Sequence, residues 1–411
     1  MPGLQPTVDP AEVGLDAQRL DRIGEYVQRE FVDPGYLTGY LAVVGRGGKV
    51  AYVGSGGQRD VAAGAPVTDD TIWRIYSMTK PITTVAAMSL VEQGKLHLKD
   101  SVARYIPSFA ESRVFSKGSP TMPQTVPLEA PMLIWHLMSH TAGLVYGFNH
   151  AHPVDAIYRE NGYDWNSPPA TDLAKACDDW AGLPLQFQPG SAWVYSVATD
   201  VLGRVIEVVT GQTLDVALRE LVLDPLGMHE TAFFAPEADH GRLAELYIPG
   251  PGLQATAMPE LGQGAKRHPR ILSGGGGLVS TAHDYQRFMD MLLAGGILDG
   301  VRVLSPRTLD YMTRNHLPGG ADLETLAQDS FSESNTAGVG FGLGFAVVQD
   351  AAASKLPMSE GSYNWGGAAS TTFFVDPMEE LTFSFFTQLL PSSTHPIRER
   401  LAPLVYQAII D

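Results

Sequence analysis

Segments near both ends of the chain carry the short-period apolar pattern that is typical of β-strands. Residues 40–44 and 50–53 flank the glycine-containing turn 46–48, which predicts a β-hairpin after an amphipathic helix over 10–31. The segments 341–348, 371–375 and 381–387 predict further strands, and 396–410 predicts a final helix. The two ends of the chain are therefore expected to supply the sheet.

Between these segments the apolar residues recur every three or four positions, as they do on helices. The clearest helical patterns cover 82–90, 131–144, 171–181, 198–209, 213–224 and 281–295. Polar or Pro- and Gly-rich stretches at 95–130, 145–170, 245–270 and 317–338 predict connections and loops, the last of them a candidate flap. We therefore expect an α/β (α+β) fold. An antiparallel sheet flanked by helices is built from residues 1–75 and 290–411, and a mainly helical domain covers 76–289, with the active site in the cleft between them.

Composition narrows the classes of function without changing this picture. The 411 residues carry a formal net charge of −17 and no run of Lys or Arg, so neither nucleic acid nor an anionic membrane is an expected partner. No stretch approaches the roughly 18 apolar residues of a membrane span, and residues 1–15 show no signal peptide, which predicts a cytoplasmic location. The single cysteine, Cys177, rules out an internal disulfide.

The segment Ser77-Met78-Thr79-Lys80 places a serine and a lysine three positions apart, where a helical pattern begins. A free serine is a weak nucleophile and needs a base within hydrogen-bond reach. Lys80 is placed to be that base, although the pKa of a free lysine is about 10.4. This pKa must fall by more than three, at a cost of about 4–5 kcal/mol, for half of the amine to be neutral at pH 7. A tyrosine that shares protons with it is a plausible partner. Tyr195 stands out because it lies at the head of a helix after a Pro-Gly turn.

These motifs together resemble the class C β-lactamase-like superfamily, in which Ser77-Met78-Thr79-Lys80 matches the Ser-x-x-Lys motif of serine β-lactamases and penicillin-binding proteins. The block 137–144 (Leu-Met-Ser-His-Thr-Ala-Gly-Leu), the pair Tyr195-Ser196, the glycine run 274–277 and Trp365-Gly366-Gly367 follow in the order of that superfamily. The resemblance covers nearly the whole chain.

Two departures from the class C pattern indicate the substrate. Trp365 replaces the lysine of the third motif, which helps to hold the β-lactam carboxylate, and Val197 stands where the second motif has an asparagine. Both changes remove polar groups that a β-lactam uses. The combination is similar to family VIII carboxylesterases, and related chains include acyltransferases of the lovastatin type. No serine lies in a Gly-x-Ser-x-Gly frame, so a second nucleophile of the α/β-hydrolase kind is not expected.

The resemblance implies a role for each motif residue. Ser77 is the expected nucleophile, Lys80 and Tyr195 together are the general base, and Tyr195 returns the proton to the leaving alcohol. The backbone N–H groups of Ser77 and Ala368 are the expected oxyanion hole. Trp365, Gly366 and Gly367 are the expected substrate-binding residues, with Trp365 as a wall of the pocket. The expected activity is hydrolysis of small esters with short to medium acyl chains through an acyl-Ser77 intermediate, with weak β-lactam hydrolysis as a side activity.

Several alternatives stay open at this point. A β-lactamase or D-Ala-D-Ala peptidase would use the same chemistry, an acyltransferase would pass the acyl group to an alcohol, and a non-catalytic relative would only bind a ligand. His136, His140, His150 and His152 are the strongest metal candidates, but no His-Glu-x-x-His motif is present and we interpret them as structural. We read Cys177 as a packing residue. No metal and no organic cofactor is expected.

Overall fold

An eight-stranded antiparallel sheet lies at the centre of the computed structural model, which describes residues 3–165, 167–328 and 335–411. The strand order is β12-β13-β14-β15-β16-β1-β2-β3. The predicted hairpin is confirmed: β1 (Gly39–Arg46) and β2 (Lys49–Asp60) are joined through Gly47 and Gly48, which have φ values of 59° and 70°. Positive φ at both turn positions is what a tight hairpin between twisted strands requires.

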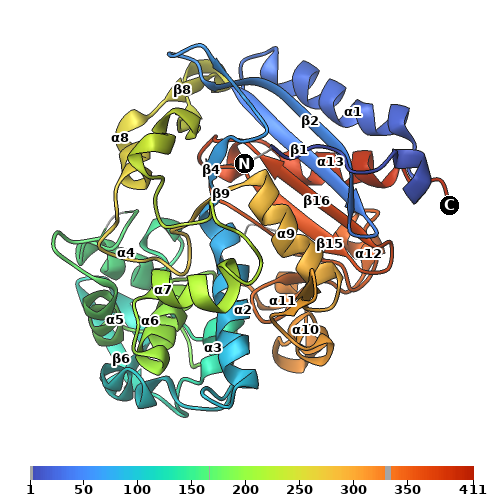
Figure 1. Cartoon of the computed structure of the whole chain (residues 1–411). Helices are drawn as coiled ribbons and strands as arrows, with labels where there is room; N and C mark the ends of the chain where they lie inside the picture. Colours follow the sequence, from blue (N-terminus) through green and yellow to red (C-terminus); the bar gives the residue numbers. More distant parts are fainter. Residues whose placement is uncertain (1–2, 166, 329–334) are drawn as a thin grey trace.

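The sheet combines both ends of the chain, as the pattern of apolar residues predicts. β1 pairs with β2 on one side and with β16 (Leu381–Phe386) on the other, and β15 (Thr372–Asp376) and β14 (Tyr363–Gly366) follow. The blue and red ribbons of the two ends lie side by side in Figure 1. The expected fold class, with helices flanking an antiparallel sheet, is therefore confirmed.

Helices cover both faces of this sheet because its strands are apolar on both sides. α1 (Ala17–Val27) and α13 (Ile397–Tyr406) cover one face of the sheet. They share an apolar core with the strand residues of that face, such as Phe383. α9 (Ala282–Leu293) packs on the opposite face, where the rings of Tyr285 and Phe373 meet edge to face at 5.1 Å. α9 lies across β15 and β16 in Figure 1.

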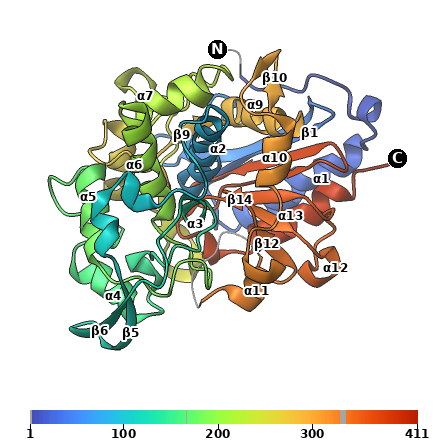
Figure 2. The same cartoon turned by 90° about the horizontal axis from the view of Figure 1, so that it is seen from below.

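The helical part gathers on one side of the sheet (Figures 1 and 2). Its helices are α2 (Thr79–Glu92), α3 (Ile134–Met138), α4 (Pro153–Glu160), α5 (Leu173–Gly182), α6 (Ala198–Thr210) and α7 (Leu214–Leu218). α6 packs against α2, α3, α5 and α7. One continuous apolar core joins these helices to the inner face of the sheet. The limit that we expected at 289/290 lies inside α9, a helix that packs on the sheet, and the division into two domains stays a prediction.

Some elements differ from the sequence-based expectation. The helix expected over 10–31 is interrupted by Gly14, whose φ of 70° separates a 3₁₀ turn (Pro10–Val13) from α1. The strand expected over 341–348 is two strands, β12 (Val339–Phe341) and β13 (Ala346–Val348), because the chain reverses near Gly344, with φ 91°. In both places a glycine in the left-handed region breaks a pattern that the side chains alone would continue.

Short elements occupy stretches that were expected to be loops or connections. They are β5 (Arg113–Ser119), β6 (Met122–Pro127), α4, β7 (Tyr247–Pro249), β8 (Ala255–Ala257), α8 (Pro259–Gly262) and α11 (Leu323–Leu326). The remaining elements are β3 (Ala65–Pro66), β4 (Ile72–Arg74), β9 (Val279–Thr281), β10 (Ile297–Leu298), β11 (Val301–Arg302), α10 (Pro306–Met312) and α12 (Ala351–Ser354). Part of the expected flap, 329–334, lies outside the described residues. Among the residues described, we find no helix with the length and apolar character that crossing a membrane needs.

Candidate active site

Ser77 lies in the 3₁₀ turn Tyr76–Met78, which leads directly into α2. The turn follows β4, and Ile75 N–H bonds the carbonyl of Leu278 at 3.1 Å. Tyr76 has a φ of 42°, an uncommon value for a residue with a side chain. The Ser77 side chain is 8% exposed. The structure thus places Ser77 at the start of a helix, where the sequence predicts it.

Lys80 points from the first turn of α2 toward Ser77. Its Nζ donates hydrogen bonds to Ser77 Oγ (3.2 Å), to the hydroxyl of Tyr146 (2.9 Å) and to the carbonyl of Gly275 (2.6 Å). The side chain is only 1% exposed. Three donated bonds are the full set of an ammonium, so Lys80 must give up the one to Ser77 Oγ when it accepts the proton of the serine. The geometry supplies the serine–lysine pair that the spacing predicts.

Tyr195 completes the group of three predicted catalytic side chains. Lys80 Nζ lies 4.5 Å from the centroid of the Tyr195 ring, and the ring is buried. The hydroxyl of Tyr195 accepts a hydrogen bond of 3.2 Å from Trp365 Nε1. The backbone carbonyl of Tyr195 accepts a weaker bond from Asn149 at 3.4 Å. The structure therefore brings the three predicted residues together, although Tyr195 lies more than 100 positions from Ser77 in the chain.

Trp365 lies at the centre of the site and not on an open wall. It stands on β14, is fully buried, and packs edge to face with Tyr195 and Phe341, both at 5.2 Å. In this state its described contacts are made with other side chains of the protein. The expected pocket-wall role is therefore not what the structure displays, and the indole N–H instead orients the Tyr195 hydroxyl.

Gly366 and Gly367 allow backbone contacts that no side chain would permit. A Cβ on Gly366 would overlap the guanidinium of Arg398, and one on Gly367 would overlap the carbonyl oxygen of Ile75, two residues before Ser77. Gly367 N–H donates to Thr371 O at 2.9 Å. These two glycines, expected as substrate-binding residues, bring the end of β14 against the turn that carries the serine.

Ala368 follows directly and packs with Tyr76 in a small apolar cluster. In the part of the chain that the structure describes, its backbone N–H donates to no protein acceptor. A buried N–H without an acceptor is rare. The role of this N–H as one half of the oxyanion hole stays a prediction.

Four functional residues were not identified from the sequence. Tyr146 follows the 137–144 block by two positions, and Gly275 belongs to the expected tight turn, but nothing in either pattern shows that they bind Lys80. Asp200, in the first turn of α6, accepts bonds from Ser273 Oγ (2.5 Å) and from Gly275 N–H (3.0 Å). It thereby fixes the loop whose carbonyl binds Lys80. Burial raises the pKa of the Asp200 carboxyl, and the charge of Lys80 opposes this shift.

Arg398, on α13, is the fourth. Its Nη2 donates to the carbonyls of Gly367 (2.9 Å) and Thr371 (3.1 Å) and so holds the loop around Ala368 from behind. An arginine in a C-terminal helix gives no sequence signal for such a role.

The four histidines do not form a metal site. Among the described residues, no group of three His, Cys, Asp or Glu side chains is arranged to hold a metal ion. His136 Nδ1 accepts from Leu133 N–H (3.0 Å) and His152 Nδ1 from Val154 N–H (3.2 Å), and both bonds cap helix starts. His140 is buried beside Ser196 Oγ (3.2 Å), and burial followed by the charge of Lys80 lowers its pKa well below the usual value.

Cys177 is fully buried, and burial raises the pKa of its thiol well above the usual value. It therefore has the character of a packing residue and not of a thiolate nucleophile.

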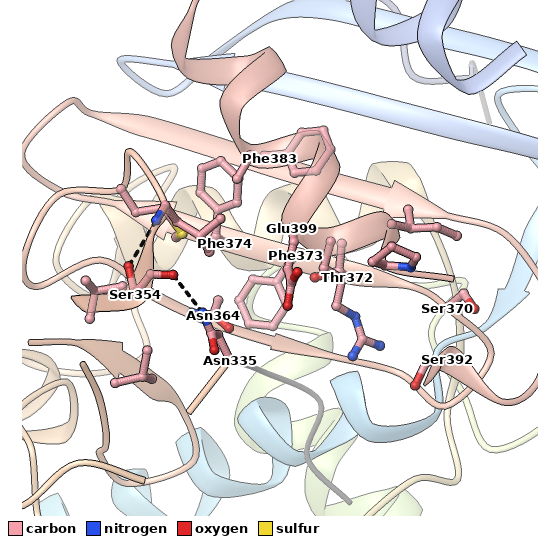
Figure 3. Close-up of a pocket in the computed structure, with 18 of the residues that line it drawn as sticks. Asn335, Ser354, Asn364, Ser370, Thr372, Phe373, Phe374, Phe383, Ser392 and Glu399 are labelled. Carbon is pink, nitrogen blue, oxygen red and sulfur yellow. Dashed lines mark hydrogen bonds between the residues drawn. The ribbon is translucent and has the colours of Figure 1, made fainter. Parts of the chain in front are cut away.

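A cavity of about 340 Å³ is lined by residues of β14, β15 and β16 (Figure 3). Asn364, Thr372, Phe374 and Phe383 project into it from the strands. Thr372 Oγ1 also donates to the carbonyl of Trp365 at 3.3 Å. The cavity therefore lies behind the strand end that carries the third motif and does not include Ser77.

Comparisons with known proteins agree with this geometry. The sequence model of the Beta-lactamase family matches residues 27–407. Esterase EstB of Burkholderia gladioli is 33% identical over 395 residues, covering 90% of this chain and 91% of EstB. An uncharacterized protein of Mycobacterium tuberculosis is 36% identical over 366 residues, covering 88% of each chain. The solved structure of EstCE1, a hydrolase with promiscuous acyltransferase activity, superposes with a TM-score of 0.80 at 28% identity, covering 96% of this chain and 99% of EstCE1. The resemblance inferred from the motifs is confirmed, and the chain belongs to the β-lactamase family.

Proposed function

We propose that this chain is a serine carboxylesterase that hydrolyses short- to medium-chain esters through an acyl-Ser77 intermediate. The observation that carries the proposal is the position of Lys80, a buried amine that binds Ser77 Oγ at 3.2 Å. Two relatives support the reaction class, because EstB is named an esterase and EstCE1 is described as a hydrolase with acyltransferase activity.

In the proposed acylation step, Ser77 Oγ attacks the ester carbonyl while its proton passes to Lys80 and Tyr195, which act together as the base. The carbonyl oxygen becomes an oxyanion and accepts hydrogen bonds from the backbone N–H groups of Ser77 and Ala368. Tyr195 then donates a proton to the leaving alkoxide as the carbon–oxygen bond breaks. In the second step, water loses a proton to the same base and attacks the acyl carbon. The base then returns this proton to Ser77 Oγ as the acyl–oxygen bond breaks, which releases the acid and regenerates Ser77.

The side chains beside this machinery favour esters over β-lactams. Trp365 provides a neutral N–H to Tyr195 where the class C pattern has a lysine ammonium. Val197, at the start of α6, is buried and apolar where that pattern has an amide. A carboxylated β-lactam would therefore lose two polar partners, and we expect only weak β-lactam hydrolysis.

The second candidate is acyl transfer, favoured by the likeness to EstCE1. An alcohol would replace water in the second step and regenerate Ser77 through the same proton carriers. Adding 1-butanol to a reaction with an ester separates the two, because a transferase forms the butyl ester at the expense of the free acid.

The test of the proposed function is a paired assay on p-nitrophenyl butyrate and nitrocefin. Wild-type protein should cleave the ester quickly and nitrocefin slowly or not at all, and Ser77→Ala should lose ester turnover while keeping its circular dichroism spectrum. Lys80→Ala should behave like Ser77→Ala. A Ser77→Ala variant that keeps most of its activity would overturn the mechanism, and loss of activity with a chelator would favour a metal hydrolase. A wild-type protein that is not labelled by a phosphonate probe would instead be a non-catalytic relative.

A further inference from the structure

Three aromatic rings stack in a row that begins at Lys80. Tyr146, whose hydroxyl binds Lys80 Nζ, stacks on Phe148 with ring centroids 4.6 Å apart and planes 18° apart. Phe148 in turn stacks on Trp165 at 4.4 Å and 12°. The row therefore extends from the proton-transfer group of the proposed site through three nearly parallel rings.

Exposure to solvent increases along this row. Lys80 is 1% exposed, Tyr146 and Phe148 are half-buried, and Trp165 is 49% exposed. The other tryptophans are buried or half-buried. An indole left half in water forgoes part of the free energy of burial, and large exposed apolar groups next to a site often mark a binding surface. The row therefore runs from the buried Lys80 to a half-exposed indole, and because each ring covers a face of its neighbour, the inner rings of this wall can offer a ligand only their edges.

Backbone contacts hold the two inner rings in place. Tyr146 and Phe148 flank Gly147, whose carbonyl accepts a bond from Arg159 Nη1, and a Cβ on Gly147 would overlap the carbonyl of Tyr163. The turn Gly147–Asn149 is therefore pressed against the segment that follows α4, two residues before Trp165. A preformed wall of this kind binds a flat group without the cost of ordering the rings first.

The position of the row indicates which part of an ester it would meet. Tyr146 binds Lys80 and packs edge to face with Tyr195 at 5.3 Å. In the proposed mechanism Lys80 and Tyr195 carry the proton that reaches the leaving oxygen. The donors of the expected oxyanion hole come instead from Ser77 and from Ala368 after β14. In the proposed mechanism the stacked rings would therefore lie beside the alcohol part of the bound ester.

We propose that the wall formed by Tyr146, Phe148 and Trp165 binds a planar aromatic group on the alcohol side of the ester, so that esters of aryl-substituted alcohols are the favoured substrates. This inference rests on the proposed function and adds the substrate class to it. Aromatic groups prefer offset-stacked or edge-to-face contacts with other rings, which gives them an advantage that an alkyl group of similar size lacks.

The test compares 3-phenylpropyl butyrate with propyl butyrate, two esters that differ only by the phenyl ring. In the wild type, kcat/KM should be higher for the phenylpropyl ester, and Trp165→Ala should lower the ratio of the two kcat/KM values about threefold to tenfold, the range of one aromatic pair. Trp165→Phe should restore most of the ratio because it keeps a ring. Met122→Ala, at an exposed hairpin tip (77% exposed), is the control and should leave both values unchanged.

The outcomes separate this inference from the proposed function. A ratio that is the same in wild type and Trp165→Ala overturns the role of the wall, while turnover of propyl butyrate upholds the esterase. If the wild type cleaves neither ester, the esterase proposal fails. The role of the wall is then tested by the binding of an aryl alcohol alone. In that case 3-phenylpropanol should protect tryptophan fluorescence, excited at 295 nm, from acrylamide quenching in the wild type and not in Trp165→Ala. An absence of protection would overturn the inference.

Discussion

Replacing Trp365 with phenylalanine would show how much negative charge Tyr195 carries during catalysis. The change removes the N–H that donates to the buried Tyr195 hydroxyl at 3.2 Å. A hydrogen bond between neutral groups contributes about 0.5–1.5 kcal/mol, and one to a charged group about 1.5–3 kcal/mol. These values correspond to losses in kcat of about 2- to 13-fold and about 13- to 160-fold. Because Tyr195 is proposed to share the proton of the base with Lys80, we predict a loss in the larger range.

The assay is steady-state kinetics with p-nitrophenyl butyrate, combined with thermal unfolding. The smaller ring leaves a space at a fully buried position, so Trp365→Phe should also unfold at a lower temperature. Phe341→Leu is the matched control, because this ring packs edge to face on Trp365 at 5.2 Å but carries no hydrogen-bond donor. It should reproduce the loss of stability without the loss of kcat. A loss below about 13-fold in Trp365→Phe, or an equal loss in Phe341→Leu, would refute the charged state of Tyr195.

Three further predictions concern residues around the site. Asp200→Asn keeps the acceptor for Gly275 N–H but removes the charge that stabilises a protonated Lys80, so the acidic limb of the pH profile of kcat/KM should move to lower pH. In Arg398→Lys a single ammonium replaces the guanidinium that binds two carbonyls. Steady-state kinetics should show a fall in kcat of about 13-fold or more, the value of one hydrogen bond with a charged group, with little change in KM. Burial lowers the pKa of His136 to about 4, below the ordinary 6.5 that it regains on unfolding. The unfolded chain therefore binds more protons between these values, so the free energy of unfolding should rise from pH 4 to 6.5, and His136→Asn should lose that rise in urea titrations.

The sequence predicts well what depends on periodicity and on ordered motifs. The hairpin around Gly47, the sheet built from both ends and the long central helices follow from apolar spacing, and the Ser77–Lys80 pair follows from helical geometry. The support of the site could not be predicted, because it depends on contacts between segments far apart in the chain. Arg398 is the clearest case, since only the folded sheet brings α13 behind Gly367. Trp365 shows a subtler limit, because the motif identified its importance while its burial and its bond to Tyr195 depend on tertiary packing.

The pairing of β1 with β16 also governs when the sheet can fold during synthesis of the chain. Leu41 pairs with Phe386, so one edge of the β1–β2 hairpin stays uncovered until β16 has left the ribosome. At synthesis rates of about 5–20 residues per second this interval lasts on the order of tens of seconds. Ser77 and Lys80 emerge long before Trp365, the Ala368 N–H and Arg398. Chains that stop before α13 would therefore carry the nucleophile without the arginine that holds the Gly367 carbonyl, and efficient hydrolysis would begin only after α13 has emerged.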